Sequence, residues 1–324
     1  MRTRLAWFML CTTAAAAIVP ATAGAADYPS KPIRLVIPFA PGGASDILAR
    51  VLAQPLGERL GQSVIIENRP GAGGTLGADM VAKAPADGHT LLIADVGAYT
   101  ISPSLYAKLP YQAGDLSPVA NLATFAHLII APPGSPFNSA ADVLASEKAR
   151  PGSLSVASSG NGTSTHLTIE MLNAAAGAKL VHIPYKGGGA ALADVMGGQV
   201  PLMVIGTPPA MPLIRSGKLK AVAVTTSTRM ASLPAVPTVA EAGVAGFESI
   251  AAQGIFAPAG TPREIVARLN NETARIIRMP EIRERWAQLG GTPIEGSPEQ
   301  FAAWLKSESD KWGKIVRDSG AKLD

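Results

Sequence analysis

A short apolar strand, a glycine turn and a helix follow one another near the start of this chain. Residues 35–37 are apolar, residues 38–43 form the turn, and a helical pattern begins at Asp46. β-Branched residues favour a buried strand, and neither Pro38 nor Pro41 can donate to a β-ladder. The glycines leave the first helical amides unpaired, and these amides together with the helix dipole favour an anion. Two interpretations follow for this unit alone: a turn that binds an anion such as a carboxylate, or a tight connection without a ligand.

The same unit recurs twice further along the chain. The strand at residues 154–157 leads into a turn of hydroxyl and glycine residues at 158–165, and the strand at 181–184 leads into three glycines at 187–189. Hydroxyl groups and unpaired amides both donate hydrogen bonds to oxyanions. The alternative for Thr163 and Ser164 is that one of them simply caps its own helix. His166 either lines a pocket or is satisfied at the helix start.

These units predict a two-domain α/β protein. A mature chain of about 300 residues suggests two domains rather than one. A strand at residues 122–130 carries the chain into the second domain, so we expect domain 1 to comprise residues 26–124 plus 247–324 and domain 2 to comprise residues 125–246. Helical patterns at 262–279, 281–289 and 298–319 complete domain 1. Helix starts that face a shared cleft suit a receptor that closes about a hinge.

The first 25 residues have the pattern of an export signal. Arg2 and Arg4 precede an apolar stretch at residues 5–19, and the small residues 23–25 offer a cleavage site. A membrane anchor is the alternative, but the apolar stretch is short and Pro20 follows it. We therefore expect a periplasmic protein with its signal cleaved near Ala25. Cys11, the only cysteine, would leave with the signal, so the mature chain would have neither a disulfide nor a thiolate.

Composition argues against several classes of partner. The 28 basic residues, less Arg2 and Arg4, leave 26 against 24 acidic ones, and only 5% of the chain is aromatic, which argues against nucleic acid. No later run of 18 uncharged apolar residues occurs, so no membrane span is expected after the signal is cleaved. The four histidines lack metal-ligand spacing, so we expect no metal.

Motifs for catalysis and for cofactors are also missing. Ser159 is not flanked by the glycines of a hydrolase elbow, and no glycine turn is followed by a Walker lysine. The second glycine turn, residues 71–77, is one residue too long for a dinucleotide fingerprint. We expect no cofactor. Donor-rich turns without a reactive group are typical of a protein that binds an anion and releases it unchanged.

The motifs of the chain resemble those of the Bug family, the extracytoplasmic receptors of tripartite tricarboxylate transporters. The resemblance covers essentially the whole mature chain, and its most specific part is Pro-Phe-Ala-Pro-Gly-Gly-Ala-Ser-Asp at residues 38–46. The other matching segments are residues 28–34, 67–74, 158–164, 184–189, 197–200, 217–219 and 258–262.

The resemblance implies a type II periplasmic-binding-protein fold, with two α/β domains joined by two crossings around a ligand cleft. In that family loops of the first domain hold a ligand carboxylate, partly through ordered waters, and loops of the second domain contact the rest of the ligand. A tripartite tricarboxylate permease or a sensor would be the partner, and the protein would be a monomer. Tyr99 is added because residues 96–100 follow the strand at 90–94, where a ligand-facing loop would lie. The predicted ligand-binding residues are Phe39, Ala40, Gly42, Gly43, Ala44, Ser45, Asp46, Tyr99, Ser158, Ser159, Gly160, Thr163, Ser164, His166, Tyr185, Gly187, Gly188 and Thr207.

One of these residues has a second interpretation, and two positions depart from the family. Asp46 either contacts the ligand or complements the dipole of its own helix. Many relatives have an aspartate where this chain has residues 205–207, and often a tryptophan in place of Ala252. If both positions face the pocket, the site is roomier and less acidic than usual. The ligand would then be an aromatic or bulkier carboxylate rather than an amino dicarboxylate or citrate.

The sequence thus predicts a periplasmic receptor for a small organic carboxylate. An exported enzyme that acts on a carboxylate is the first alternative, and it requires turnover and a perturbed acid or base in the cleft. A purely protein-binding envelope domain is the second, and it would show no thermal shift with small molecules.

Overall fold

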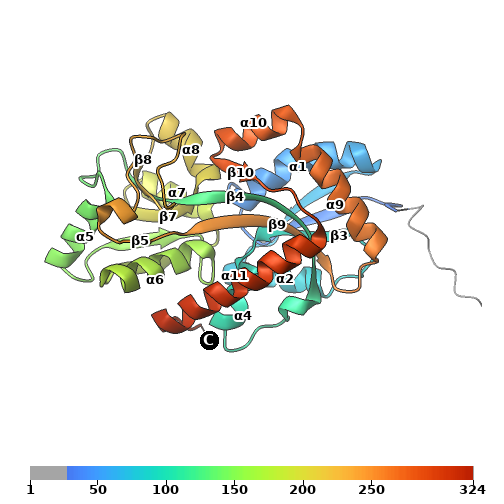
Figure 1. The fold of residues 1–324 in the computed structure, drawn as a ribbon, viewed down its shortest axis with the longest axis horizontal. Helices are drawn as coiled ribbons and strands as arrows, with labels where there is room; N and C mark the ends of the chain where they lie inside the picture. The colour runs from blue at the N-terminus through green and yellow to red at the C-terminus, as the bar shows by residue number, and fades with distance from the viewer. Residues whose placement is uncertain (1–27, 324) are drawn as a thin grey trace, which may run out of the picture.

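A continuous mixed sheet connects two α/β lobes in the computed structural model, which describes residues 28–323 (Figure 1). The predicted signal therefore lies outside the described residues. The first part of lobe 1 comprises β1 (Ile33–Ile37), α1 (Ala44–Leu60), β2 (Val64–Asn68), η2 (Ala72–Gly74), α2 (Thr75–Ala82), β3 (Thr90–Asp95), α3 (Gly97–Thr100), α4 (Ser102–Leu105) and η3 (Ala113–Asp115). Its second part comprises β9 (Ile250–Pro258), α9 (Arg263–Ile277), α10 (Pro280–Gln288), β10 (Gly291–Pro293) and α11 (Pro298–Ser319).

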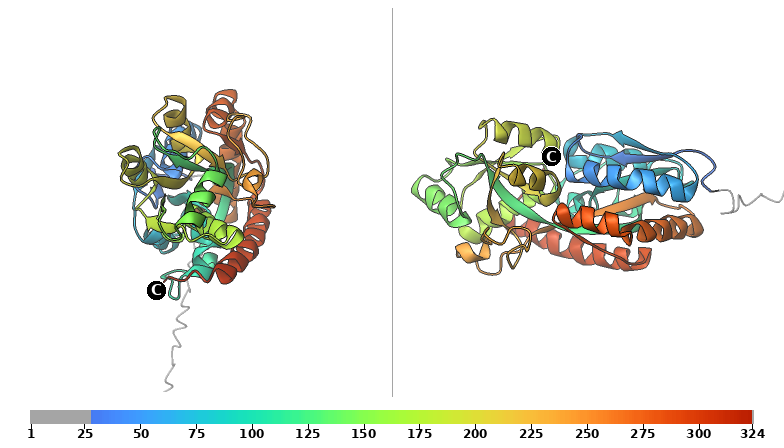
Figure 2. Two further views of the ribbon diagram at one scale, coloured as in Figure 1. Left: turned by 90° about the vertical axis from the view of Figure 1, so that its left-hand side faces the viewer. Right: turned by 90° about the horizontal axis from the view of Figure 1, so that it is seen from above.

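Lobe 2 is built from the middle of the chain. It comprises α5 (Ala140–Ala149), β5 (Ser155–Ser158), α6 (Ser164–Ala176), β6 (Val181–Pro184), α7 (Gly188–Met196), β7 (Leu202–Gly206), α8 (Thr207–Arg215), β8 (Lys220–Val224) and η4 (Ala240–Ala242). The two lobes lie side by side when the molecule is seen from above (Figure 2).

The long strand β4 (Leu116–Ala131) belongs to both lobes. Its first part pairs antiparallel with β9, and from His127 onward it pairs with β7 and β8 instead. The partner exchange lies close to the predicted crossing at residues 124–125, although the division into domains itself stays a prediction. β4 begins earlier than the predicted strand at 122–130. Pro118 is tolerated there because the pairing with β9 shifts register next to it.

The same strand arrangement is present in each lobe. The sheet order is β2-β1-β3-β9-β4-β7-β5-β6, with β1 parallel to β2 and β3, and β5 parallel to β6 and β7. Four of these strands, β1, β2, β5 and β6, are followed by the glycine turns and helix starts predicted from the sequence. Ligands of open α/β sheets bind outside the carboxyl ends of parallel strands. The topology therefore predicts a ligand site between the lobes.

Helix α11 packs across both lobes (Figure 1). Its buried side chains Trp312 and Val316 form one apolar cluster with Ile101 and Leu105 of lobe 1 and with Leu167 of α6 in lobe 2. The lobes are thus joined by shared apolar packing as well as by the two strands. No helix within residues 28–323 combines the length and the apolar composition that a bilayer span requires.

Replacement of Trp312 by alanine tests this shared cluster. Trp312 is 2% exposed, and truncation of a buried tryptophan typically costs about 3–5 kcal/mol. We expect a loss of that size in the free energy of unfolding, measured by urea titration with circular dichroism. Met196→Ala is the control, because Met196 is 40% exposed and surface changes usually stay within about 0.5 kcal/mol. Equal losses for both variants would contradict the shared cluster.

Candidate functional site

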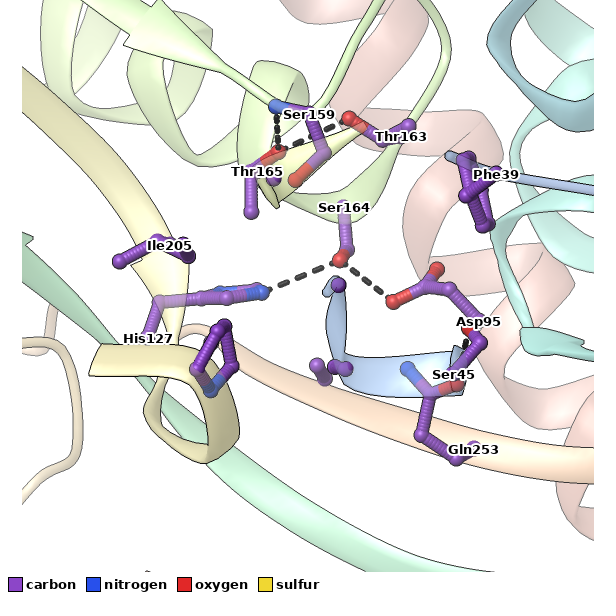
Figure 3. A pocket seen from close by; sticks show the side chains of 16 residues that line it. Phe39, Ser45, Asp95, His127, Ser159, Thr163, Ser164, Thr165, Ile205 and Gln253 are labelled. Atoms are coloured by element: carbon purple, nitrogen blue, oxygen red, sulfur yellow. Dashed lines mark hydrogen bonds between the residues drawn. The ribbon is translucent and has the colours of Figure 1, made fainter. Parts of the chain in front are cut away.

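A cavity of about 460 Å³, its opening to solvent included, lies between the lobes (Figure 3). Its lining comes from both lobes and from the strands that connect them. The lining residues are Phe39, Gly43, Ala44, Ser45, Asp95, His127, Ser159, Thr163, Ser164, Thr165, Gly188, Ile205, Gly206, Pro209, Ala251 and Gln253.

Four helices begin at this cavity. Gly43, Gly187 and Gly206 are the N-cap residues of α1, α7 and α8, and none of the three helices has a side-chain cap. α6 differs, because the Thr163 Oγ1 accepts a hydrogen bond from the His166 amide at 3.3 Å. Thr163 therefore caps its own helix and also lines the cavity. Uncapped helix starts such as those of α1 and α7 present amide donors and a positive dipole end to the space in front of them. The start of α8 has fewer donors, because Pro208 and Pro209 have no N–H.

Asp46 lies beneath the first glycine turn and does not line the cavity. Its carboxylate accepts hydrogen bonds from the Gly42 amide (3.0 Å), Asn68 Nδ2 (3.0 Å) and Arg50 Nε (2.9 Å). Burial alone would raise the pKa of Asp46, but these hydrogen bonds together lower it. The structure therefore gives Asp46 a role in holding the turn, with its oxygens already engaged within lobe 1.

A row of three polar side chains crosses the cavity (Figure 3). The Ser164 hydroxyl donates to Asp95 Oδ2 at 2.8 Å, and His127 Nε2 lies 3.0 Å from the same hydroxyl. Burial lowers the pKa of His127 to about 3, so its imidazole is neutral at physiological pH. Because the Ser164 hydroxyl donates its hydrogen bond to Asp95, its oxygen can only accept from His127. Nε2 is therefore the protonated nitrogen of the His127 ring. The row joins β3 of lobe 1 to α6 of lobe 2 and to the connecting strand β4.

The glycine turns of the two lobes meet in a closed arrangement. The Ala40 amide donates to the Lys186 carbonyl across the gap at 3.1 Å. A Cβ at Gly189 would lie 2.4 Å from the Pro41 carbonyl oxygen, and one at Gly73 would lie 1.7 Å from the Asn161 carbonyl oxygen. Atoms other than hydrogen cannot occupy these spaces. The glycines are therefore required for the close approach of the lobes.

The structure brings eight of the predicted ligand-binding residues to the cavity: Phe39, Gly43, Ala44, Ser45, Ser159, Thr163, Ser164 and Gly188. The other ten do not line it: Ala40, Gly42, Asp46, Tyr99, Ser158, Gly160, His166, Tyr185, Gly187 and Thr207. Contact of any of these residues with a ligand stays a prediction.

Packing explains why several predicted side chains lie elsewhere. Residues 97–100 form the short helix α3 rather than an open loop, and Tyr99 stacks on Phe256 with ring centroids 5.6 Å apart. Thr207 Oγ1 donates to the Gly290 carbonyl at 3.2 Å. Tyr185 lines a second hollow at the rim of the cleft, where its hydroxyl donates to Asp194 at 2.6 Å. The hydroxyls of Thr207 and Tyr185 are therefore hydrogen-bonded within the protein.

Eight lining residues were not predicted: Asp95, His127, Thr165, Ile205, Gly206, Pro209, Ala251 and Gln253. For three of them the sequence carries a usable signal. Asp95 ends the apolar strand β3, and His127 and Gln253 interrupt the apolar runs of β4 and β9. A polar residue in a buried strand is unusual and needs a partner. Attention to such positions would have identified these residues.

The two departures from the family pattern have different outcomes. Ile205 and Gly206 line the cavity, but Ala252 packs in the core with Phe256 and Phe301 on the other face of β9. Alternation along a strand explains this, because the neighbours of Ala252 face the cavity instead. The prediction that both positions face the pocket is therefore wrong for Ala252. Asp95 also makes the cavity more acidic than the sequence suggested.

Comparison with known proteins identifies the family of this chain. The family model described as tripartite tricarboxylate transporter family receptor matches residues 48–321. The chain belongs to this family. Protein BugT of Bordetella pertussis is 37% identical to it over 311 residues, which are 95% of each chain. Members of the family are solute-binding receptors, so the family predicted from the motifs is confirmed.

Solved structures confirm the predicted fold. R. palustris Rpa4515 with adipate superposes with a TM-score of 0.88 at 35% identity, covering 92% of this chain and all of that one. MatC from Rhodopseudomonas palustris with bound malate gives a TM-score of 0.85 at 34% identity, covering 89% of this chain and all of that one. The receptor therefore has the two-domain α/β fold of periplasmic binding proteins.

Replacement of Gly189 by alanine tests the closed contact between the lobes. A Cβ added at Gly189 meets only lobe 1 atoms, and the φ of this residue is one that alanine also adopts, so the open receptor should fold normally. We expect a larger radius of gyration in small-angle X-ray scattering, because the lobes cannot approach fully. Gly114→Ala is the matched control, since nothing lies within 4 Å of its Cβ position. Equal radii for both variants would contradict the closed arrangement.

A stacked histidine pair beside the site predicts sensitivity to acid. The rings of His166 and His182 lie 4.1 Å apart. Burial lowers the pKa of His166 to about 4, and burial and then His166 lower the pKa of His182 to about 3. An unfolded histidine titrates near 6.5, so the unfolded chain takes up protons below that pH that the folded receptor does not. Folding stability should therefore fall as pH drops below about 6.5.

His182→Gln provides the measurement for this pair. Each histidine contributes at most about 1.4 kcal/mol per pH unit, and partial exposure to solvent reduces this. We expect the free energy of unfolding to decline less steeply between pH 6.5 and 5 in His182→Gln than in the parent, while His127 keeps part of the decline. Identical slopes would refute the assignment.

Proposed function

We propose that this chain is a periplasmic receptor that binds a small organic carboxylate in the cavity between its lobes. The observation that carries the proposal is the convergence of the uncapped starts of α1 and α7, one from each lobe, on one cavity. These helix starts favour an anion without a cationic side chain. Adipate in Rpa4515 and malate in MatC, two carboxylates bound by family relatives, support the same ligand class.

The ligand carboxylate would lie against the Gly43–Ser45 turn of lobe 1 and the Gly188 turn of lobe 2. Both turns line the cavity, and both belong to the segments that meet in the closed arrangement. Closure would remove the ligand from water, which strengthens each amide contact. Binding and closure would then be one event, with the ligand stabilising the contact between the lobes.

A membrane permease of the tripartite tricarboxylate type, or a sensor, would receive the loaded receptor. The signal pattern of residues 1–25 supports export with cleavage near Ala25, and the receptor would act as a monomer. The family description as a transporter receptor supports a permease as the usual partner.

Catalysis by an exported enzyme has one observation in its favour, since burial raises the pKa of Asp95 inside the cavity. The neighbouring groups argue against hydrolysis of the Ser-His-Asp type. The Ser164 hydroxyl donates a hydrogen bond to Asp95. His127 lies on the other side of the serine, rather than between the serine and the acid. A catalytic triad needs the histidine to take the serine proton. The row therefore orients side chains and supplies no activated nucleophile.

The proposal is tested by ligand binding with a charge-matched pair of variants. Ala44 lies at the start of α1 and lines the cavity. We expect the wild type to gain thermal stability with one or more carboxylates from a panel and no stability with the corresponding primary amides. Ala44→Asp places an anion where the ligand carboxylate would bind, so it should weaken binding at least about tenfold more than Ala44→Asn through like-charge repulsion.

The same samples separate the alternatives. Calorimetric titration gives the affinities, and mass spectrometry after incubation shows whether the carboxylate returns intact. Consumption of the carboxylate would favour the enzyme. An absence of thermal shift with every carboxylate, or equal effects of Ala44→Asp and Ala44→Asn, would contradict carboxylate binding at this turn.

A further inference from the structure

Asp95 is the one acidic side chain among the residues that line the cavity. None of the lining residues of the described chain is lysine or arginine, and His127 is neutral. Asp95 is 9% exposed and lies at the end of β3 in lobe 1. The electrostatic character of the cavity is therefore set by backbone amides and by one carboxylate.

This carboxylate occupies the start of a helix in the opposite lobe. Asp95 Oδ2 accepts from the Ser164 hydroxyl at 2.8 Å, and the Ser164 amide also donates to Asp95. Asp95 Oδ1 accepts from the Gly97 amide at 2.8 Å. Burial raises the pKa of Asp95, whereas these three hydrogen bonds lower it. Three donors on two oxygens are the arrangement that stabilises the ionised form of a carboxylate. The start of α6 is already occupied by an anion of the protein itself.

The four helix starts at the cavity are consequently not equivalent. Those of α1 and α7 have no side-chain cap, whereas α6 has both Thr163 and Asp95. The start of α8 offers few donors, because Pro208 and Pro209 have no N–H. A ligand carboxylate is favoured at the starts of α1 and α7 and repelled near Asp95, because like charges in a shared buried site oppose each other. Figure 3 shows Asp95 in the cavity wall beside Ser164, on the side opposite His127.

We propose that Asp95 is a specificity-determining residue that makes this receptor select monocarboxylates over dicarboxylates of the same length. The preferred ligand has one carboxylate, held by the α1 and α7 turns, and an uncharged far end. A hydroxyl or amide at that far end donates a hydrogen bond toward Asp95. This inference rests on the proposed carboxylate receptor and narrows its ligand class. Malate in MatC and adipate in Rpa4515 are both dicarboxylates, so the proposed ligand differs from theirs.

Pairs of ligands that differ only in the far group test the inference. Succinate is paired with 4-hydroxybutanoate, and adipate with 6-hydroxyhexanoate, in calorimetric titrations at pH 7.5. We expect the wild type to bind the better hydroxy acid at least about tenfold more tightly than its dicarboxylate partner, because like-charge juxtaposition is strongly unfavourable. In Asp95→Asn the preference should shrink by at least about tenfold, since the amide removes the charge and adds a donor.

Asp79→Asn is the control for net charge. Asp79 lies on α2 outside the cavity and pairs with Lys83, so this variant should keep the preference of the wild type. Asp95→Ser is a second variant in case the asparagine cannot be accommodated in the row with Ser164. If neither variant folds, the wild-type ratio alone decides the inference.

The outcomes distinguish this inference from the proposed function. Binding of both members of each pair with equal affinity by the wild type would overturn the role of Asp95, as would an unchanged ratio in a folded Asp95 variant. Carboxylate binding would survive in either case. A panel in which no carboxylate of either class binds would instead overturn the receptor proposal, and the role of Asp95 with it.

Discussion

The close approach of glycine turns from two lobes is the constraint on which this structure depends. Backbone amides act as anion donors only when nothing stands between them and the anion, and a side chain at Gly189 or Gly73 would collide with the main chain of the other lobe. The Ala40 amide bonded to Lys186 shows how near the two backbones come. Charged side chains could hold an anion from a distance, but amides cannot. The absence of lysine and arginine from the lining of the cavity in the described chain therefore makes the close approach necessary.

The scaffold allows that approach because two strands and one helix connect the lobes. β4 and β9 run through the junction, and α11 packs on each lobe through the cluster that contains Trp312. β4 exchanges one partner strand for another within a single element, so the lobes are aligned without a flexible linker. Phe39 lines both the cavity and the hollow at the rim of the cleft, and it separates the two spaces.

The sequence predicted the elements whose local signals agree with their packing. The last helix was predicted at residues 298–319, where the structure has α11. Local signals agree with it, because Ser297 forms a capping box, Pro298 suits the first helical position and Gly320 adopts the left-handed conformation. The glycine turns were also predicted, because their local sequence signals agree with the way they pack. β10 was missed, since a three-residue strand has no periodicity and forms only against β4.

The site was harder to predict because half of it depends on contacts between distant segments. Ser164 was predicted as a donor to a ligand, yet it donates to Asp95, which is 69 positions away in the chain. Periodicity within one segment carries no information about such a pair. Asp46 shows the converse: a carboxylate in a promising motif is engaged by Asn68 and Arg50 of its own lobe. Local patterns identify which groups can bind an anion, but tertiary pairing decides which of them are still available. In this receptor that pairing leaves the amides of the α1 and α7 turns available and engages Asp95 with Ser164 of the opposite lobe.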